Sequence, residues 1–188
     1  MNPSTVANHQ QPSILFFNQK QRRNHHGKTV FMLVRWNSLF YREALMLRNR
    51  VLKESAGKPY LFEAPIEEKQ DIHLVVRYGE EVVGTLLLHP VTSSFVQIKQ
   101  VAIDPLMQGK HLGKKMMIYA EEIAHRCGFS TIFLTGRKQD WGFYDKLAYQ
   151  ELPYEYQEDQ LILKVFKKDI RQPLSRINTK EMKTNGRQ

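Results

Sequence analysis

Strand-like and helix-like hydrophobic patterns alternate through the middle of this chain. Residues 29–36 (TVFMLVRW) are rich in β-branched and aromatic side chains, which favours a strand. Residues 39–55 then carry apolar side chains at helical spacing, which predicts an amphipathic helix. The apolar face predicted for this helix consists of Leu39, Ala44, Leu47, Val51 and Leu52.

A β-hairpin and a further strand are predicted next. Residues 71–90 contain two β-rich runs, which Gly79-Glu80-Glu81 separates as a short turn. Residues 94–104 form another β-rich run, and Asp104-Pro105 ends it. This part of the chain therefore supplies three expected strands.

The most regular helical pattern covers residues 111–128, where Gly128 provides a C-terminal stop. The side chains that share its apolar face are Leu112, Met116, Tyr119, Ala120, Ile123 and Ala124. Residues 130–136 (STIFLTG) predict a short buried strand, residues 142–150 begin in a helix, and residues 161–166 (LILKVF) predict a last strand. A strand–helix–strand unit flanked by hairpins predicts a mixed α/β fold, with a mixed, mostly antiparallel central sheet flanked by helices.

The positive charge of the chain is concentrated at its two ends. The formal net charge is +9, of which residues 1–31 contribute +4 and residues 164–188 contribute +6, leaving −1 for residues 32–163. Charged ends of this kind are usually solvated tails. Nucleic-acid binding through them is the alternative, and it is disfavoured because no helix-turn-helix, zinc-finger or aromatic RNA-binding pattern accompanies them.

One domain is expected between two polar ends. Residues 1–27 are rich in Asn, Gln, Ser and His and lack periodicity, which predicts a disordered, basic N-terminal segment. The folded domain is expected at residues 28–167, and residues 168–188 are expected to form a basic polar tail.

Composition restricts the class of protein further. Of the 188 residues, 41% are hydrophobic and 25% are charged, which is typical of a soluble globular domain. No run approaches the roughly 20 apolar residues of a membrane helix. Cys127 is the only cysteine, so no intramolecular disulfide or cysteine-pair metal site can form. We expect a cytoplasmic protein without a metal and without membrane association, and a homodimer is one oligomeric state that the sequence allows.

The segment IKQVAIDPLMQGKHLGKK combines a strand, a glycine-bearing loop and a helix start. The first amides of a helix lack intrahelical partners and carry partial positive charge, so they bind anions such as phosphate. Gly109 and Gly113 let an anion approach closely, while Lys110, Lys114 and Lys115 add positive potential. An ordinary strand-to-helix turn eased by glycines is the alternative.

This segment resembles motif A of the GNAT acetyltransferases. In that family a strand ending apolar–x–apolar–x–Pro leads into the pattern Q/R-x-x-G-x-G/A. The matching positions here are Val101-Ala102-Ile103-Asp104-Pro105, Gln108, His111 and Gly113. The resemblance implies that the strand at Val101 and Ile103 faces the pantetheine arm of acetyl-CoA. It also implies that the CoA pyrophosphate is bound by Gln108, Gly109, Lys110, His111, Leu112, Gly113 and Lys114.

A second resemblance follows in the expected order, to the family's motif B, written F-Y-x-K-L-G-F/Y. The residues that fit it are Phe143, Tyr144, Lys146, Leu147 and Tyr149. Arg137 stands seven residues before Tyr144, where relatives often have Arg or Asn. His111 and Ala148 depart from the pattern, because the family usually has Gly at both positions. The resemblance covers roughly residues 30–166.

The resemblance implies a chemical role for Tyr144. When an amine attacks the thioester, the departing thiolate needs a proton, and a neutral tyrosine can donate it. In many relatives this tyrosine contacts the CoA sulfur. A core tyrosine without a chemical role is the alternative. Cys127 has no accompanying His/Asp arrangement, so direct transfer is favoured over an acetyl-enzyme.

The general base stays open at this stage. Some relatives place a glutamate on the strand before motif A, but residues 95–103 contain no carboxylate. A base acting through water, or an amine that arrives neutral, is an equal alternative. The candidate residues are Gln97, Lys99, Gln100, His73, His89, Glu63, Glu67 and Glu68. The three glutamates also suggest attraction of a cationic acceptor, although a solvated acidic face explains them as well.

The resemblance thus implies an N-acetyltransferase that moves an acetyl group directly from acetyl-CoA to a primary amine of a small molecule. Two alternatives come from other classes. One is a GNAT-fold module that binds acyl-CoA without catalysis, since a fold does not guarantee its usual function. The other is a nucleic-acid-associated protein that uses the basic ends.

Overall fold

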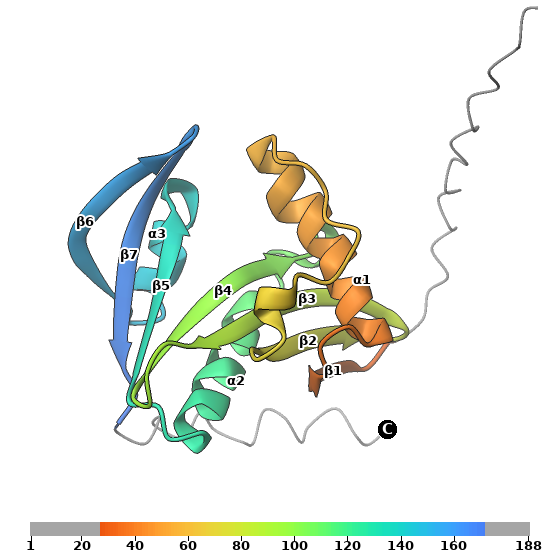
Figure 1. Cartoon of the computed structure of the whole chain (residues 1–188), viewed down its shortest axis with the longest axis horizontal. Helices are drawn as coiled ribbons and strands as arrows, with labels where there is room; N and C mark the ends of the chain where they lie inside the picture. The colour runs from red at the N-terminus through yellow and green to blue at the C-terminus, as the bar shows by residue number, and fades with distance from the viewer. Residues whose placement is uncertain (1–26, 172–188) are drawn as a thin grey trace, which may run out of the picture.

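A seven-stranded, mostly antiparallel sheet forms the centre of the molecule (Figure 1). The structure is a computed structural model that describes residues 27–171, so the segments 1–26 and 172–188 lie outside the described residues. The strand order is β1-β2-β3-β4-β5-β7-β6, and all described pairs are antiparallel except β4–β5. The strands are β1 Thr29–Val34, β2 Ile72–Tyr78, β3 Glu81–Pro90, β4 Phe95–Ile103, β5 Thr131–Arg137, β6 Gln150–Glu158 and β7 Leu161–Asp169. The predicted mixed α/β fold is confirmed.

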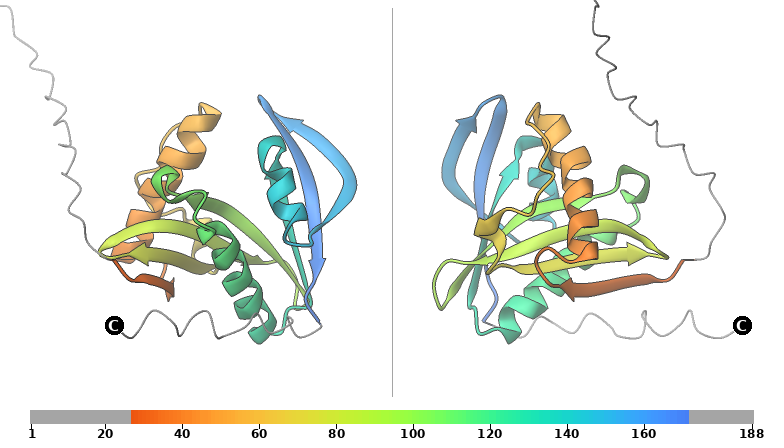
Figure 2. Two further views of the ribbon diagram at one scale, coloured as in Figure 1. Left: turned by 180° about the vertical axis from the view of Figure 1, so that it is seen from behind. Right: turned by 45° about the vertical axis from the view of Figure 1, so that its right-hand side comes forward.

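Helices cover both faces of this sheet. The helix α1 (Leu39–Arg48) packs on one face of β2, β3 and β4, and α2 (Leu112–Arg126) packs on the opposite face (Figure 2). The short helix α3 (Trp141–Asp145) lies against β5. The crossover through α2 joins β4 to β5, which explains why this pair is parallel. Within the described residues, no helix is long and apolar enough to cross a membrane.

The helix predicted at residues 39–55 forms, but it changes its winding along its length. After α1 the chain continues as a π-helical turn, η1 (Asn49–Lys53), and a 3₁₀ turn, η2 (Glu54–Ala56), which ends at Gly57. The other four residues of the predicted apolar face are buried or half-buried as expected, but Leu39 is 69% exposed, so its assignment to that face was wrong. The buried face centres on Tyr41 and Leu45, and Leu39 lies beyond it at the first helical position.

The predicted apolar face of α2 is the centre of the larger core. Leu112, Met116, Ala120 and Ala124 are buried, and Tyr119 and Ile123 pack against the same cluster from its margin. Helix α2 runs within two residues of the predicted range 111–128 at each end.

A β-bulge in β4 determines which face each of its side chains occupies. Gln100 adopts a left-handed φ of 56°, and the register against β3 shifts at the same level. Ile98 before the bulge, and Val101 and Ile103 after it, all pack against the core on the α2 side. Ala102 instead joins the smaller cluster under α1. The bulge therefore displaces the alternation of side chains by one residue.

The C-terminal half of the sheet extends further than the sequence predicted. Strand β6 was not assigned, because its exposed sequence QELPYEYQE lacks a clear apolar alternation and contains Pro153. Such a proline is tolerated here because β6 is an edge strand with a bulge between Glu151 and Glu155. Strand β7 continues past the predicted domain end at residue 167, and Ile170 is buried, so the folded domain reaches at least that residue.

Replacing Ala148 by Gly should stabilise the protein by about 0.5–1 kcal/mol. Ala148 has a left-handed φ of 61°, a conformation that costs a non-glycine residue about 1–2 kcal/mol, partly offset by the greater unfolded-state entropy of glycine. Urea denaturation of both proteins measures the change. The control is Ala64→Gly in an ordinary loop, which should lower the stability; a loss of stability in Ala148→Gly would contradict the prediction.

Candidate active site

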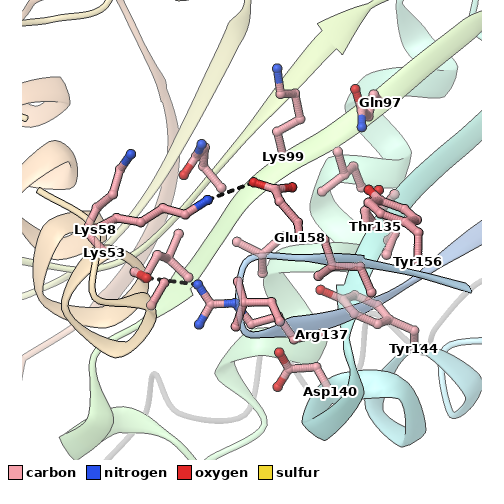
Figure 3. Close-up of a pocket in the computed structure, with 18 residues that line it drawn as sticks. Lys53, Lys58, Gln97, Lys99, Thr135, Arg137, Asp140, Tyr144, Tyr156 and Glu158 are labelled. Atoms are coloured by element: carbon pink, nitrogen blue, oxygen red, sulfur yellow. Dashed lines mark hydrogen bonds and ion pairs between the residues drawn. The ribbon is translucent and has the colours of Figure 1, made fainter.

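A cleft opens where β4 and β5 separate. The two strands pair only from Phe95↔Thr131 to Ile98↔Leu134, whereas β4 stays paired with β3 as far as Gly84↔Ile103. One backbone edge of β4 is therefore unpaired beyond Ile98. The cleft has a volume of about 350 Å³ and is bordered by β4, β5, α3, the β6–β7 hairpin and the chain after α1. Figure 3 shows the side chains that line it. Its charged lining residues are Lys53, Lys58, Lys99, Arg137, Asp140 and Glu158.

The loop predicted to bind pyrophosphate leads from β4 into α2. Asp104 accepts a hydrogen bond from the Leu106 amide at 2.9 Å and begins the 3₁₀ turn Pro105–Met107. Gly109 and His111 then both adopt left-handed conformations, with φ of 73° and 58°. No side chain caps the helix at His111, and the first helical bond joins the Lys115 amide to the His111 carbonyl. The preceding amides of the first turn are therefore the ones available to an anion.

The conformation of His111 explains the family's preference for glycine at this position. A left-handed φ suits glycine best, and histidine is among the few other residues that adopt it with some frequency. The close approach of an anion to the Gly113 backbone stays a prediction, and the structure adds a packing contact on the side of its missing Cβ. A Cβ at Gly113 would lie 3.4 Å from the Phe143 ring and 3.7 Å from Ile103, so this position faces the packing between α2, α3 and β4.

The structure brings only some of the predicted residues to the cleft. Val101 and Tyr144 line it. Ile103 is half-buried against the core and Leu112 is buried in it, and neither is among the residues that line the cleft. The side-chain Nε2 of Gln108 donates to the Ile103 carbonyl at 3.1 Å, which ties the loop to the end of β4.

Tyr144 is held firmly at the wall of the cleft. Its ring packs against Phe143, Tyr149 and Phe166, with centroids 5.2, 6.1 and 5.3 Å away. Gly136 allows this close approach, because a Cβ there would lie 2.8 Å from the Tyr144 ring. Figure 3 shows the Tyr144 hydroxyl pointing into the cleft. Burial, followed by the nearby Asp140 charge, raises the pKa of this hydroxyl well above its ordinary value near 10, so it stays protonated at neutral pH.

Two contacts join the C-terminal half of the sheet to the chain that follows α1. Arg137 on β5 donates to the Ser55 hydroxyl at 2.8 Å and to the Leu52 carbonyl at 2.9 Å. Lys58 pairs with Glu158 at 2.7 Å at the end of β6 (Figure 3). Both contacts cross the opening between the two halves of the sheet, and they fix the width of the cleft on its α1 side.

Asp140 is a titratable cleft residue that the sequence did not suggest. Burial raises the pKa of its carboxyl, and the neighbouring Arg137 guanidinium opposes that rise. Asp140 and Glu158 are the two carboxylates that line the cleft among the described residues. Their position could be inferred only once α3 and β6 were placed.

The histidines and glutamates considered as general bases lie outside the cleft. Glu68 is buried, where it accepts hydrogen bonds from Arg48 and Tyr41. His73 donates to the Glu68 carbonyl, and burial lowers its pKa. The three polar residues of β4 do line the cleft, namely Gln97, Lys99 and Gln100. The acidic loop therefore does not supply a negative surface to the cleft.

The sequence matches the profile of the acetyltransferase (GNAT) family over residues 33–149, more than half of the chain. The chain therefore belongs to the GNAT acetyltransferase family, a family of acyltransferase enzymes. It has no significant sequence match among curated proteins.

Solved structures with the same fold include three that the chain covers almost completely. Escherichia coli ElaA aligns with a TM-score of 0.65 and 17% identity, over 76% of this chain and 100% of that one. An aminoglycoside 6'-N-acetyltransferase complexed with coenzyme A aligns with a TM-score of 0.62 and 12% identity, over 77% of this chain and 99% of that one. A GNAT family acetyltransferase from Elizabethkingia anophelis with acetyl-CoA bound aligns with a TM-score of 0.56 and 11% identity, over 75% of this chain and 97% of that one. At these identities the likeness establishes the fold.

Proposed function

We propose that this protein transfers an acetyl group from acetyl-CoA directly to a primary amine of a small molecule. The observation that carries the proposal is the separation of β4 from β5 beside Tyr144. The opening leaves one backbone edge of β4 unpaired beyond Ile98, with Val101 and Tyr144 at its wall.

The residues present suit acetyl-CoA at this opening. The unpaired edge of β4 offers amide and carbonyl groups to an extended, amide-containing chain such as pantetheine, as a neighbouring strand would. The free amides at the start of α2 suit the pyrophosphate, and Lys110 and Lys114 are exposed beside them. The thioester that acetyl-CoA supplies would then lie toward Tyr144.

Tyr144 is proposed as the proton donor in this reaction. Attack of a neutral amine on the thioester forms the new C–N bond, and the C–S bond then breaks with its electron pair leaving on sulfur. The protonated Tyr144 hydroxyl donates its proton to that sulfur, the amine's surplus proton passes to solvent, and the Tyr144 phenolate regains a proton from solvent before the next turnover. The packed rings around Tyr144 fix the hydroxyl position and exclude water from behind it.

Acetyl-CoA should raise the melting temperature of the full chain, and free thiol should be released when a suitable amine is added. At a concentration 100-fold above the dissociation constant, a bound ligand adds about 2.7 kcal/mol to the stability. Thermal denaturation and thiol release, each with a panel of small amines, measure the two effects. Thermal stabilisation without turnover of any amine would indicate a non-catalytic acyl-CoA-binding module. The absence of both effects would overturn the proposal.

A further inference from the structure

The net charge of the cleft lining is opposite in sign to the net charge of the domain as a whole. Its four cationic side chains stand against two carboxylates, an excess of two positive charges. Residues 32–163, which supply all of this lining, carry a net charge of −1. The positive charge is therefore concentrated at the cleft rather than spread over the domain.

Two of these cations have neither an ion pair nor a hydrogen bond within the described residues. Lys58 is paired with Glu158 and Asp159, and Arg137 donates to Ser55 and Leu52. For Lys53 and Lys99, by contrast, the described part of the chain provides no ion pair or hydrogen bond. Both residues are half-buried and line the cleft, so their charges are available to a ligand there.

These lysines lie on the opposite side of the sheet from the loop suited to pyrophosphate. Lys99 alternates with Ile98, which faces the α2 side, so Lys99 faces the α1 side. Lys53 ends the helical turn that continues α1. The glycine-bearing loop opens α2 on the other face. Figure 3 shows Lys53 and Lys99 at the side of the cleft away from Tyr144 and Asp140. The CoA phosphates are therefore not their natural partners.

We propose that the acceptor amine carries an anionic group, a carboxylate or a phosphate, which Lys53 and Lys99 bind on the α1 side of the cleft. This inference rests on the proposed function and specifies its substrate class. An acidic group bound there directs the amine of the same molecule toward Tyr144. A polycationic amine is repelled by the same lining. This replaces the expectation, drawn from Glu63, Glu67 and Glu68, that the acceptor is attracted as a cation.

Matched pairs of acceptors test the proposal on the full chain. Glycine is compared with glycinamide, and O-phosphoethanolamine with ethanolamine, so that each pair differs in its acidic group. We expect kcat/KM to be at least tenfold higher for the acidic member of one or both pairs. The pair that shows the preference identifies the anion as carboxylate or phosphate. Equal rates, or a preference for the uncharged members, would overturn the inference while leaving the proposed acetyltransferase intact.

Variants of the two lysines provide the second arm. Lys53→Met and Lys99→Met keep most of the apolar stem and remove the charge. Each should raise KM for the acidic acceptor about tenfold or more, with KM for acetyl-CoA changed less than twofold. Lys167→Met, an exposed position of β7 outside the cleft, is the matched control and should change neither constant. A parallel rise in KM for acetyl-CoA would assign the lysines to the cofactor and overturn the inference.

A calorimetric measurement covers the case in which no acceptor of the panel turns over. O-phosphoethanolamine and glycine are titrated into the wild-type protein and both variants in the presence of CoA. Binding to the wild type that is lost in the variants supports the anion site, even though the proposed function has then failed. If the wild type and both variants bind these ligands equally, or if none of the three binds them, the proposed anion site is overturned.

Discussion

Replacing Glu68 by Gln should destabilise the protein by about 3–5 kcal/mol. Glu68 and Arg48 are 7% and 5% exposed, and the Arg48 guanidinium contacts both carboxylate oxygens at 2.9 and 3.1 Å. Tyr41 donates to the same carboxylate at 2.6 Å. Removing the negative charge leaves the buried Arg48 uncompensated, which is the costly event in such a pair. Chemical denaturation of the full chain measures the loss.

The same substitution at an exposed pair is the control. Glu80 pairs with Arg77 at 2.9 Å, but its side chain is 97% exposed, so Glu80→Gln should change the stability by less than 1 kcal/mol. A double variant, Arg48→Met with Glu68→Leu, removes both charges and should recover part of the stability lost in Glu68→Gln. A loss below 1 kcal/mol in Glu68→Gln would contradict the structural role assigned to the pair.

This pair also shows why one part of the site was misjudged from the sequence. Glu68 stands in an acidic loop sequence beside Glu67, and nothing local distinguishes a solvated carboxylate from a buried one. Its partners Arg48 and Tyr41 lie 20 and 27 residues away. Only the packing of α1 against the turn Ile66–Glu68 shows that this carboxylate holds the fold together.

Local signals were sufficient where one segment carries the whole feature. The helix at residues 111–128 has its own apolar face and its own stop, so it could be predicted closely. The replacement of the family's usual glycine by His111 and by Ala148 could likewise be recognised from the sequence, since both residues lie within short motifs. Their cause, a left-handed backbone conformation at each position, is visible only in the structure.

The lining of the cleft could not be predicted, because it is assembled from segments far apart in the chain. Lys53 follows α1, Lys99 lies on β4 and Glu158 ends β6, a strand whose sequence gave no clear pattern. The side on which Lys99 lies also follows from the strand alternation and from the separation of β4 and β5. Motif resemblance located Tyr144 and Arg137, but the charge of the opposing wall required the tertiary structure.

Replacing Tyr144 by Phe should lower kcat by about 10²–10⁴-fold and leave the dissociation constant of acetyl-CoA little changed. The substitution deletes the proposed proton donor, and effects of this size are typical of losing a general acid. The ring keeps its contacts with Phe143 and Phe166, so the free energy of unfolding should change by about 1 kcal/mol or less. Initial rates with one competent amine, together with calorimetric titration of acetyl-CoA, measure both constants.

The pH dependence separates this role from a purely structural one. The pKa of the Tyr144 hydroxyl is raised by burial, so the donor stays protonated as the pH rises through 10, and the wild-type rate should show no decline from Tyr144 between pH 6 and 10. The defect of Tyr144→Phe should therefore be constant over that range. Tyr119→Phe on α2, outside the cleft, removes the same hydroxyl group and should leave kcat within about twofold. Near-normal turnover of Tyr144→Phe at every pH, with acetyl-CoA binding intact and with single-turnover rates that exclude a slow product release, would remove Tyr144 from the mechanism.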